Sequence, residues 1–471
     1  EKSIQKVMDR HEILRTSFQS INGEPKQIIK KYSFNLEIES IAESEIEEKV
    51  NEHSYQAFNL ANGPLFRVKV FKISETFNVV SFVMHHIISD GWSMGILMDE
   101  VFKFYGGFIS NKEIKLEDLQ IQYKDFAHWQ NQELNSESAV NHQKYWLDKL
   151  NGHIEPIDLP TIKSRPPNLN NKAAQFSAKI NHELTDSIKK FCLEQGISVF
   201  MFVNGVLKAL VYRYTGQTDL VFGSPIAGRA HADLTNQIGF FVNTLVLRDE
   251  VNGEKSFIEL IKEVKETILD AFDHQIYPYD KLVDDLSLER SLNRNPLFDI
   301  MVGMQNIDNQ NGNDHFELVE QNLELSRISS GESQSKFDLT FNFFESEEIL
   351  LNLEYRSELY SAEFISQFWM HFIKYTSELI SNVTAKIGEL NFLTVEEKQE
   401  LIGFGATENI SLTSNNTIVT YFDLSVEKNA KRIASIHNNS EISFIELQAL
   451  SFKYANGLAL NNIKKGDVVA C

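Results

Sequence analysis

The sequence is short of cysteine, of basic residues and of long apolar runs. Two cysteines, Cys192 and Cys471, cannot build a disulfide framework or a four-thiolate zinc site, and such usage suits a reducing cytosol. Acidic residues outnumber basic ones by 66 to 45, for a formal charge of −21, which disfavours nucleic acid and anionic lipid as partners. The best candidate for a membrane span, residues 199–212, is too short and holds Asn204 and Lys208, so it predicts a buried helix. We therefore expect a cytoplasmic protein with no nucleic-acid or membrane partner.

Several chemical motifs are also missing. The sequence has no Gly-x-x-x-x-Gly-Lys-Ser/Thr loop and no Gly-x-Gly-x-x-Gly turn, so nothing in it supports nucleotide binding. It has no Gly-x-Ser-x-Gly elbow, which is typical of serine hydrolases. A zinc site needs further ligands at metal spacing, and neither a His-Glu-x-x-His motif nor paired cysteines are present. We therefore expect no metal.

What is present indicates a globular chain of several parts. Apolar residues make up 42% and charged residues 24%, ordinary values for a folded protein. Residues 151–171 hold four of the nine prolines, which is typical of a linker. A second boundary falls near residues 395–415, which are rich in Gly, Thr, Asn and Ser. The expected parts are a first lobe at 1–160, a second lobe at 161–395, a linker at 396–414 and an incomplete α/β segment at 415–471. Both ends look cut, so we expect a fragment of a longer polypeptide.

Hydrophobic spacing predicts helices and strands in both lobes, hence an α/β fold built as an α+β sandwich. In the first lobe we expect a helix at the start, a short strand pair within 27–39, a strand at 77–88 and a helix at 93–105. In the second lobe we expect strands at 174–180, 220–222, 245–247, 298–305, 338–344 and 350–355. Helices are expected there at 182–195, 198–214, 257–272 and 361–380, with a polar loop at 305–313.

The strongest chemical signal lies at residues 84–93, Met-His-His-Ile-Ile-Ser-Asp-Gly-Trp-Ser. Adjacent side chains on a strand point to opposite faces, so only one of His85 and His86 can face a given cavity while the other braces the turn. An imidazole that titrates near neutrality can handle a proton or orient a nucleophile. A lone strand histidine is more often structural, but the four-residue pattern with Asp90 and Gly91 is much rarer than any single histidine.

Asp90 and Gly91 have more than one possible role. Asp90 could accept a hydrogen bond from a ring N–H or pair with an arginine, and either contact would fix the loop. Gly91 allows close approach of a substrate, and its N–H could serve a developing oxyanion.

These residues resemble the condensation domain of nonribosomal peptide synthetases, a family with a His-His-x-x-x-Asp-Gly motif. Further blocks match in the family's order, at residues 10–18, 123–129, 238–244, 274–279 and 294–298. The resemblance covers about residues 1–395, although the chain begins within the family's second block, and Ile276 and Tyr279 replace the Asp and Phe of many relatives. Residues 442–447 and 465–469 in the tail resemble the opening of an adenylation domain.

The resemblance implies a fold and a reaction. The fold would be two chloramphenicol-acetyltransferase-like lobes in a V with a central tunnel. An upstream donor and a downstream acceptor carrier domain would dock at its mouths, and an adenylation domain would adjoin in the same chain. No cofactor would be bound directly, because both substrates arrive on phosphopantetheine arms of the carriers. The acceptor amine would attack the donor thioester to form an amide, an acyltransferase-type reaction in antibiotic or other secondary-metabolite synthesis.

The resemblance also assigns roles to residues. His86 has the key role, with His85 and Gly91 beside it, and Asp90 is a brace paired with an arginine. We expect that arginine to be Arg229, with Arg15 and Arg294 as runners-up. Trp92 and Ser93 would support the site, and Asn243 and Thr244 are tunnel candidates.

The subtype and the alternatives follow from smaller features. Ser93, together with residues 239–244, resembles domains that join two L-configured residues. Heterocyclising relatives replace the histidine pair with aspartates, so cyclisation is not expected. The alternatives are a non-catalytic module that recruits carriers or a modifying enzyme, an epimerisation-type relative, and a stand-alone acyltransferase that uses free coenzyme A.

Overall fold

The computed structural model describes residues 1–170, 172–288, 293–306, 326, 333–405, 417–437, 440–464 and 467. Most of the predicted polar loop at 305–313 and most of the predicted block at 465–469 lie outside these residues, and the first two residues of that loop belong instead to a strand, Ile300–Asn306. The chain divides into two compact units, residues 1–394 and 395–471. The boundaries predicted at residues 160 and 414 stay predictions.

The first lobe is built on two small sheets. Strands β1 (Thr16–Ile21) and β2 (Glu24–Ile29) form an antiparallel hairpin. Strands β3 (Glu37–Ser40), β4 (Phe66–Lys72) and β5 (Asn78–Met84) form a second sheet, in which β3 is parallel and β5 antiparallel to β4. The helices of this lobe are α1 (Lys2–Arg10), α2 (Ile46–Tyr55) and α3 (Gly91–Ile109).

The core of the first lobe includes one residue that comes from the second. Val7 and Met8 of α1 pack with Leu97 of α3, and all three are fully buried. Ile238 belongs to the same cluster although it lies on the connection between two strands of the second lobe. The second lobe therefore inserts a segment into the first.

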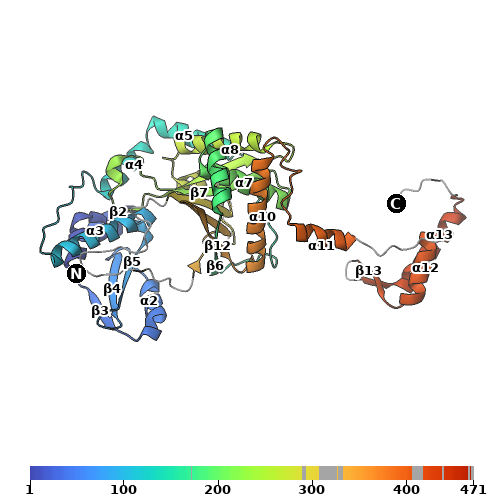
Figure 1. The fold of residues 1–471 in the computed structure, drawn as a ribbon, viewed down its shortest axis with the longest axis horizontal. Helices are drawn as coiled ribbons and strands as arrows, with labels where there is room; N and C mark the ends of the chain where they lie inside the picture. The colour runs from blue at the N-terminus through green and yellow to red at the C-terminus, as the bar shows by residue number, and fades with distance from the viewer. Residues whose placement is uncertain are drawn as a thin grey trace. The chain divides into compact units, whose positions relative to one another are not determined.

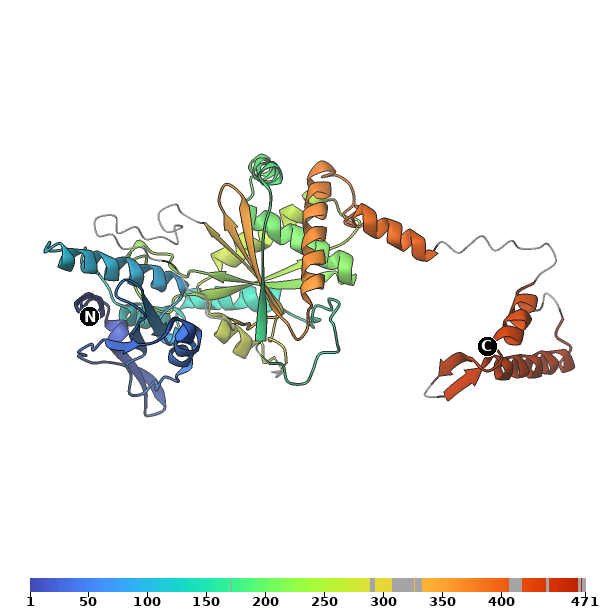
Figure 2. The ribbon, with the colours of Figure 1, turned by 60° about the horizontal axis from the view of Figure 1, so that its bottom comes forward.

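A seven-stranded mixed sheet forms the second lobe, in the order β10-β6-β12-β11-β9-β7-β8. Helices α7, α8 and α10 lie on one side of this sheet and the first lobe lies on the other (Figures 1 and 2). The strands are β6 (Lys172–Lys179), β7 (Asp219–Ile226), β8 (Asn243–Glu250), β9 (Ile300–Asn306), β10 (Ser333–Gln334), β11 (Leu339–Glu345) and β12 (Ile349–Arg356). The remaining helices within residues 1–394 are α4 (Tyr123–Glu133) and α5 (Glu137–Lys149), which precede the second lobe, and α6 (His182–Gln195), α7 (Val199–Thr215), α8 (Phe257–Asp273), α9 (Tyr279–Asp285) and α10 (Ala362–Ser381), which belong to it.

Helix α7 confirms the buried helix predicted near residues 199–212. Ser198 caps its first turn through a hydrogen bond from the Met201 N–H, and Gly216 ends it in a left-handed conformation with φ of 72°. Lys208 is fully buried and donates to the Leu247 carbonyl at 2.9 Å and to the Asp249 carboxylate. The charge inside this apolar helix is therefore neutralised by β8.

Two predictions for the first lobe are wrong. The predicted pair within 27–39 does not form, because β2 pairs with β1 and β3 pairs with β4. The strand predicted at 77–88 ends at Met84, and residues His86–Ile88 form a 3-10 turn, η3. The apolar pattern continues through this turn, since Ile88 is fully buried, and so the pattern alone does not mark the end of the strand.

The second unit contains α11 (Val395–Gly405), α12 (Ile418–Asn429), the antiparallel pair β13 (Ile433–His437) and β14 (Ser440–Ser443), and α13 (Phe444–Leu460).

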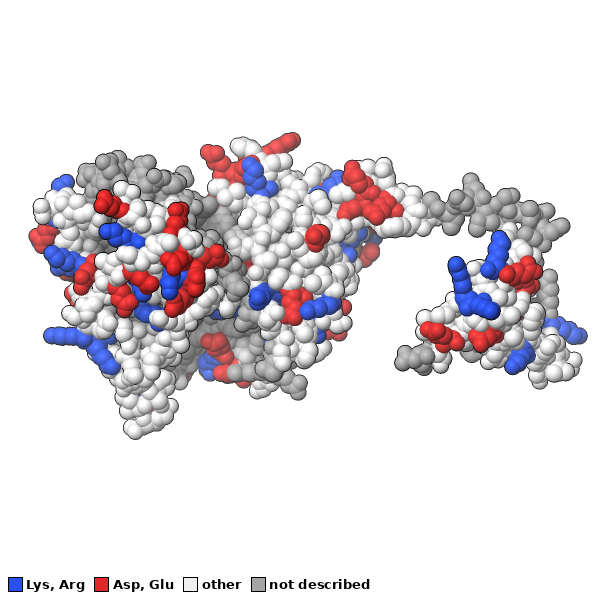
Figure 3. All heavy atoms as spheres, turned by 90° about the horizontal axis from the view of Figure 1, so that it is seen from below, with Lys and Arg blue, Asp and Glu red and all other residues white. Residues whose placement is uncertain are grey.

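No single helix among the described residues has the length and apolarity to cross a bilayer, and only α6 with α7, bent by 105°, passes that test as a pair. Acidic and basic side chains are interspersed over the face drawn in Figure 3.

Candidate active site

His85 braces the turn that follows β5. Its Nδ1 accepts a hydrogen bond from the Ile87 N–H at 3.0 Å, which caps the 3-10 turn. Its ring meets Phe58 edge-on, with 6.0 Å between ring centroids. Both contacts lie within the first lobe, so this imidazole is engaged in local structure.

His86 is held in one tautomer and faces the second lobe. Its Nδ1 lies 2.7 Å from the Ser89 carbonyl oxygen, and since a carbonyl only accepts, Nδ1 carries the hydrogen. In the neutral ring Nε2 then has a free lone pair. The residue is exposed, and its ring packs edge-on against Phe240 with 4.9 Å between centroids. The imidazole therefore lies where the two lobes meet, and the hydrogen bond to Ser89 leaves its Nε2 available.

The ion pair predicted between Asp90 and Arg229 is present and joins the lobes. The Arg229 Nη2 donates to Asp90 Oδ1 at 3.1 Å and to Oδ2 at 3.2 Å, and both side chains are buried. The Arg229 Nη1 donates to the carbonyls of Leu234 at 2.6 Å and Gln237 at 2.7 Å. Burial lowers the pKa of the Arg229 guanidinium, and the Asp90 charge opposes that change.

Asp90 also begins helix α3. Its Oδ1 accepts from the Ser93 N–H at 2.8 Å and from the Ser93 hydroxyl at 2.7 Å, the contact expected of an N-cap. Its Oδ2 accepts from the Phe241 N–H at 3.1 Å. Both carboxylate oxygens are occupied by donors of the protein itself, which fits a brace rather than a proton donor.

The two runner-up arginines are wrong as partners of Asp90. Arg15 lies 3.8 Å from Glu12 and donates to the Met8 carbonyl, all within the first lobe. Arg294 pairs with Asp299 in the second lobe. Neither contacts the motif, because each has a carboxylate or carbonyl close to it in sequence.

Trp92 and Gly91 occupy the first turn of α3. The Trp92 indole N–H donates to the Thr235 carbonyl across the lobes at 2.9 Å, although the residue is 52% exposed. Gly91 is the first helical residue, so its N–H has no acceptor within the helix. A Cβ added at Gly91 would meet nothing within 4 Å. The space on the side-chain side of Gly91 is therefore open, and its N–H lies at the positive end of the helix dipole.

Residues 238–241 of the second lobe are here named the crossing segment. First-lobe side chains contact each of these four residues. The Ile238 N–H donates to His11 Nδ1 at 3.4 Å. The Gly239 N–H donates to the Ser93 hydroxyl oxygen at 3.1 Å, and the Gly239 carbonyl oxygen lies 2.9 Å from that same hydroxyl oxygen. The Phe240 carbonyl accepts from the Tyr123 hydroxyl at 3.0 Å, and the Phe241 N–H is the donor to Asp90.

His11 and Tyr123 are site residues that the sequence did not single out. Burial, reinforced by the Asp90 charge, raises the pKa of the Tyr123 hydroxyl to about 12, so it stays a donor at neutral pH. No individual role was assigned to either residue from the sequence. The available signal was their presence in the matching blocks at 10–18 and 123–129.

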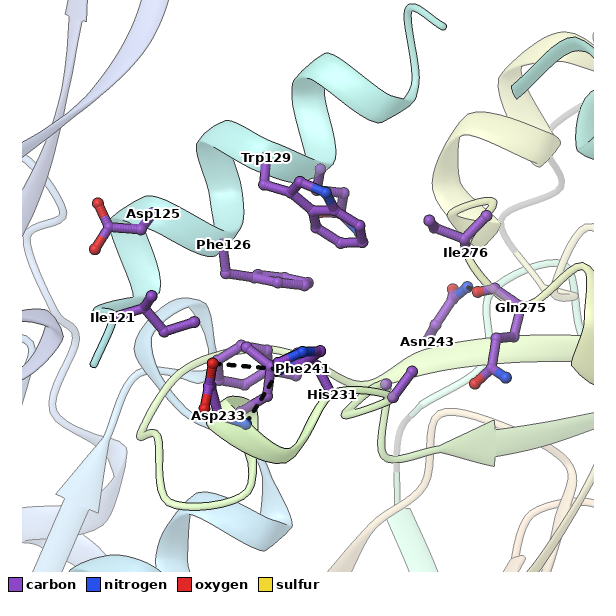
Figure 4. A pocket seen from close by; sticks show the side chains of 14 residues that line it. Ile121, Asp125, Phe126, Trp129, His231, Asp233, Phe241, Asn243, Gln275 and Ile276 are labelled. Carbon is purple, nitrogen blue, oxygen red and sulfur yellow. Dashed lines mark hydrogen bonds and ion pairs between the residues drawn. The ribbon is translucent and has the colours of Figure 1, made fainter. Parts of the chain in front are cut away.

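An apolar cavity lies beside the crossing segment (Figure 4). It has a volume of about 460 Å³, and Phe126 and Trp129 of α4 face Phe241 and Ile276 across it. Asn243 lines the cavity, and its amide also donates to the carbonyls of Gln275 and Tyr277 at 2.8 and 2.9 Å. Within the described chain the lining includes neither His86 nor Thr244. Phe240 and Phe241 thus present one ring to His86 and one to the cavity.

Metal-ligating side chains do not gather here. Across the residues that the structure describes, no group of three or more His, Cys, Asp or Glu could hold a metal ion. Cys192 is buried in the second lobe, and burial raises the pKa of its thiol to about 12, which makes it a poor nucleophile.

Comparisons with known proteins agree with this arrangement. A family model described as "Condensation domain" matches residues 1–402. The chain is 34% identical over 472 residues to gramicidin S synthase 2 of Brevibacillus brevis, covering 100% of this chain and 10% of that protein. It is 35% identical over 474 residues to tyrocidine synthase 3 of Brevibacillus parabrevis, of which it covers 7%. The chain thus spans a tenth or less of the length of these relatives.

The fold is shared with a solved structure, the X-domain in complex with OxyB from teicoplanin biosynthesis. The TM-score is 0.75 at 22% identity, over 84% of this chain and 87% of that one. This likeness bears on the fold alone, and it confirms the predicted class of chloramphenicol-acetyltransferase-like α/β lobes.

Proposed function

The chain belongs to the condensation-domain family of nonribosomal peptide synthetases, and on that premise we propose that it joins two carrier-bound substrates through an amide bond. The α-amine of the acceptor attacks the carbonyl carbon of the donor thioester. The new C–N bond forms, the C–S bond breaks, and one proton passes from the amine to the leaving thiolate. Both substrates remain tethered to carrier domains by phosphopantetheine arms, and the condensation domain binds no cofactor of its own.

His86 orients the attacking amine through its Nε2. An α-amine has a pKa of roughly 7.7–8 in model peptides, so a good fraction of it is already a free nucleophile near neutrality. Orientation within attacking distance can therefore supply much of the rate, on the order of several kcal/mol. After attack the amine becomes acidic, and Nε2 can accept its proton and return it to the sulfur.

The observation that carries this proposal is the hydrogen bond from His86 Nδ1 to the Ser89 carbonyl at 2.7 Å. Because Nδ1 donates to the turn, the other ring nitrogen, Nε2, points away from it and keeps its lone pair. A residue that accepts a hydrogen bond from an amine needs such a lone pair. The Gly91 N–H, first in α3 at a residue with open space on its side-chain side, suits the oxyanion of the tetrahedral intermediate. Asp90 and Arg229 serve as the brace that holds α3 against the second lobe.

The finer assignments rest on the resemblance and are part of the proposal. The partners are a donor carrier, an acceptor carrier and an adenylation domain that begins in the tail from residue 415. The cavity beside Asn243 suits the apolar part of one tethered substrate, because apolar and aromatic side chains line most of it. The substrates are L-configured on both sides, as Ser93 and residues 239–244 suggest.

Three other functions compete with condensation. A recruiting module would bind carriers without using His86, and an epimerisation-type relative would invert an α-carbon. A stand-alone acyltransferase would take its acyl group from free coenzyme A. The exposed lone pair on His86 favours a reaction over recruitment, and the long synthetases among the relatives favour carrier-bound donors.

The test is product analysis on the complete synthetase that contains this chain. Its donor and acceptor carriers are loaded with two L-amino acids of different mass, and the carrier-bound products are released and analysed by mass spectrometry and chiral chromatography. An amide-linked dipeptide of L,L configuration on the acceptor carrier is the expected result. An inverted residue without a new bond indicates epimerisation, and unchanged aminoacyl carriers indicate recruitment. Transfer from free acyl-coenzyme A at the same rate would contradict the requirement for a carrier.

A further inference from the structure

The imidazole of His11 is buried between the lobes and contacts both. None of its surface is exposed. Its Nε2 lies 2.9 Å from Glu100 Oε2 on α3, and its Nδ1 lies 3.4 Å from the Ile238 backbone nitrogen on the crossing segment. The Arg10 Nε donates to the other oxygen of Glu100 at 3.0 Å, so this carboxylate serves as an acceptor on that side as well.

Both contacts require the same tautomer. A charged carboxylate only accepts, so Nε2 carries the hydrogen, and a backbone N–H only donates, so Nδ1 presents its lone pair. A neutral His11 satisfies Glu100 and Ile238 together. The contact with Glu100 fixes the orientation of the imidazole, and the imidazole in turn fixes the position of the Ile238 backbone in the other lobe.

The segment that His11 holds ends against the proposed catalytic imidazole. Ile238 is fully buried in the first-lobe core, so the segment cannot slide without exposing it. Two residues later, the Phe240 ring packs edge-on against His86 with 4.9 Å between centroids. The Phe240 carbonyl is tied to Tyr123 at 3.0 Å. A rotation of the backbone at Ile238 therefore moves the ring that limits the orientation of His86.

We propose that His11 is a positioning residue for condensation, which acts through Ile238 to hold Phe240 against His86. The inference rests on the proposed function of His86. A displacement of about 1 Å at a reacting group can cost about 100-fold in rate. The loss of the hydrogen bond between His11 and Ile238 can therefore affect the rate of the reaction more than the stability of the fold.

Two substitutions separate the two contacts of His11. In His11→Asn the amide oxygen takes the place of Nδ1 and can still accept from the Ile238 N–H, while Glu100 loses one donor but keeps Arg10. In His11→Gln the longer side chain can donate to Glu100, while the Ile238 N–H loses its acceptor. Each variant gives up one buried hydrogen bond, so their unfolding midpoints should fall by similar amounts.

Single-turnover amide formation is measured in the complete synthetase with loaded carriers. We expect His11→Asn to keep the rate within about threefold of wild type, and His11→Gln to lose about 10- to 100-fold with half-saturation by the acceptor carrier unchanged. Equal rates in the two variants, or losses that simply follow the unfolded fraction, would overturn the positioning role.

A second measurement does not depend on amide formation. Hydrogen exchange of the amides at residues 238–241, together with the NMR signals of a labelled His86 ring, is compared in the same variants. We expect faster exchange and a shifted His86 signal in His11→Gln but not in His11→Asn. If wild type forms no amide while this difference is found, the proposed function fails and the contact stands; if the two variants give identical exchange and identical His86 signals, the positioning inference fails whatever the chemistry.

Discussion

Arg229 donates to both carboxylate oxygens of Asp90, at 3.1 and 3.2 Å, from the opposite lobe. The same carboxylate caps helix α3 and accepts from the backbone of Phe241. One side chain thus sets the start of a helix, the join between the lobes and the path of the crossing segment. The aspartate of the motif thus serves the architecture, and under the proposed function His86 is the residue of the motif that contacts the attacking amine.

The buried ion pair should be strongly coupled. Removal of one partner, by Asp90→Asn or Arg229→Gln, should lower the free energy of unfolding by about 3–5 kcal/mol, because the other charge stays buried without its counter-ion. The double variant should lose less than the sum. A urea-unfolding double-mutant cycle measures this, with the exposed pair Lys386 and Glu254 as the matched control, expected below about 1 kcal/mol. Additive losses at the buried pair would contradict the coupling.

Close approach of the crossing segment to α4 requires glycine at position 239. A Cβ added there would overlap the ring of Tyr123. Gly239→Ala should therefore destabilise the protein by about 1–3 kcal/mol, the usual cost of overpacking, and slow amide formation. Gly95→Ala in α3 is the control, since a Cβ there meets nothing within 4 Å and should stabilise by about 0.5–1 kcal/mol. Thermal unfolding of both variants tests this, and an unaffected Gly239→Ala would show that the segment packs less tightly.

The Tyr123 hydroxyl should give a measurable alkaline dependence. Its pKa is raised to about 12 in the folded protein, against roughly 10 in an unfolded chain. Since the folded pKa is the higher, the stabilisation is fully present below pH ~10 and is lost as the pH rises toward that of the folded group. Tyr123→Phe should cost about 1 kcal/mol at pH ~8, and this difference should shrink above pH ~10. Urea unfolding across this range checks it, and a constant difference would contradict a buried hydroxyl.

Local signals predicted four helices of the second lobe closely, α6, α7, α8 and α10, but not the short α9. Ser198 and Gly216 bracket α7 as a cap and a left-handed end should, and Asn181 and Gly196 bracket α6 in the same way. Cap chemistry is written in the few residues around a helix end, so a single sequence carries it. The strand order of the sheet depends on pairings between distant segments, and no local pattern specifies those.

The candidate site was predicted in part for the same reason. The motif at residues 85–91 is contiguous, and so the sequence displays it. The contact of His11 with Ile238 joins residues 227 positions apart, and that of Tyr123 with Phe240 joins residues 117 apart. His86 was also placed on a strand rather than in a 3-10 turn, because Ile87 and Ile88 continue the apolar pattern while the backbone turns.

The most direct test of the account is the single-turnover rate of amide formation by the complete synthetase carrying His86→Ala. His153→Ala, at an exposed site, is the matched control. The account predicts a loss of about 100-fold or more for His86→Ala, with an unfolding midpoint close to wild type and no change in the control. Amide formation by His86→Ala at a near-normal rate would contradict the account.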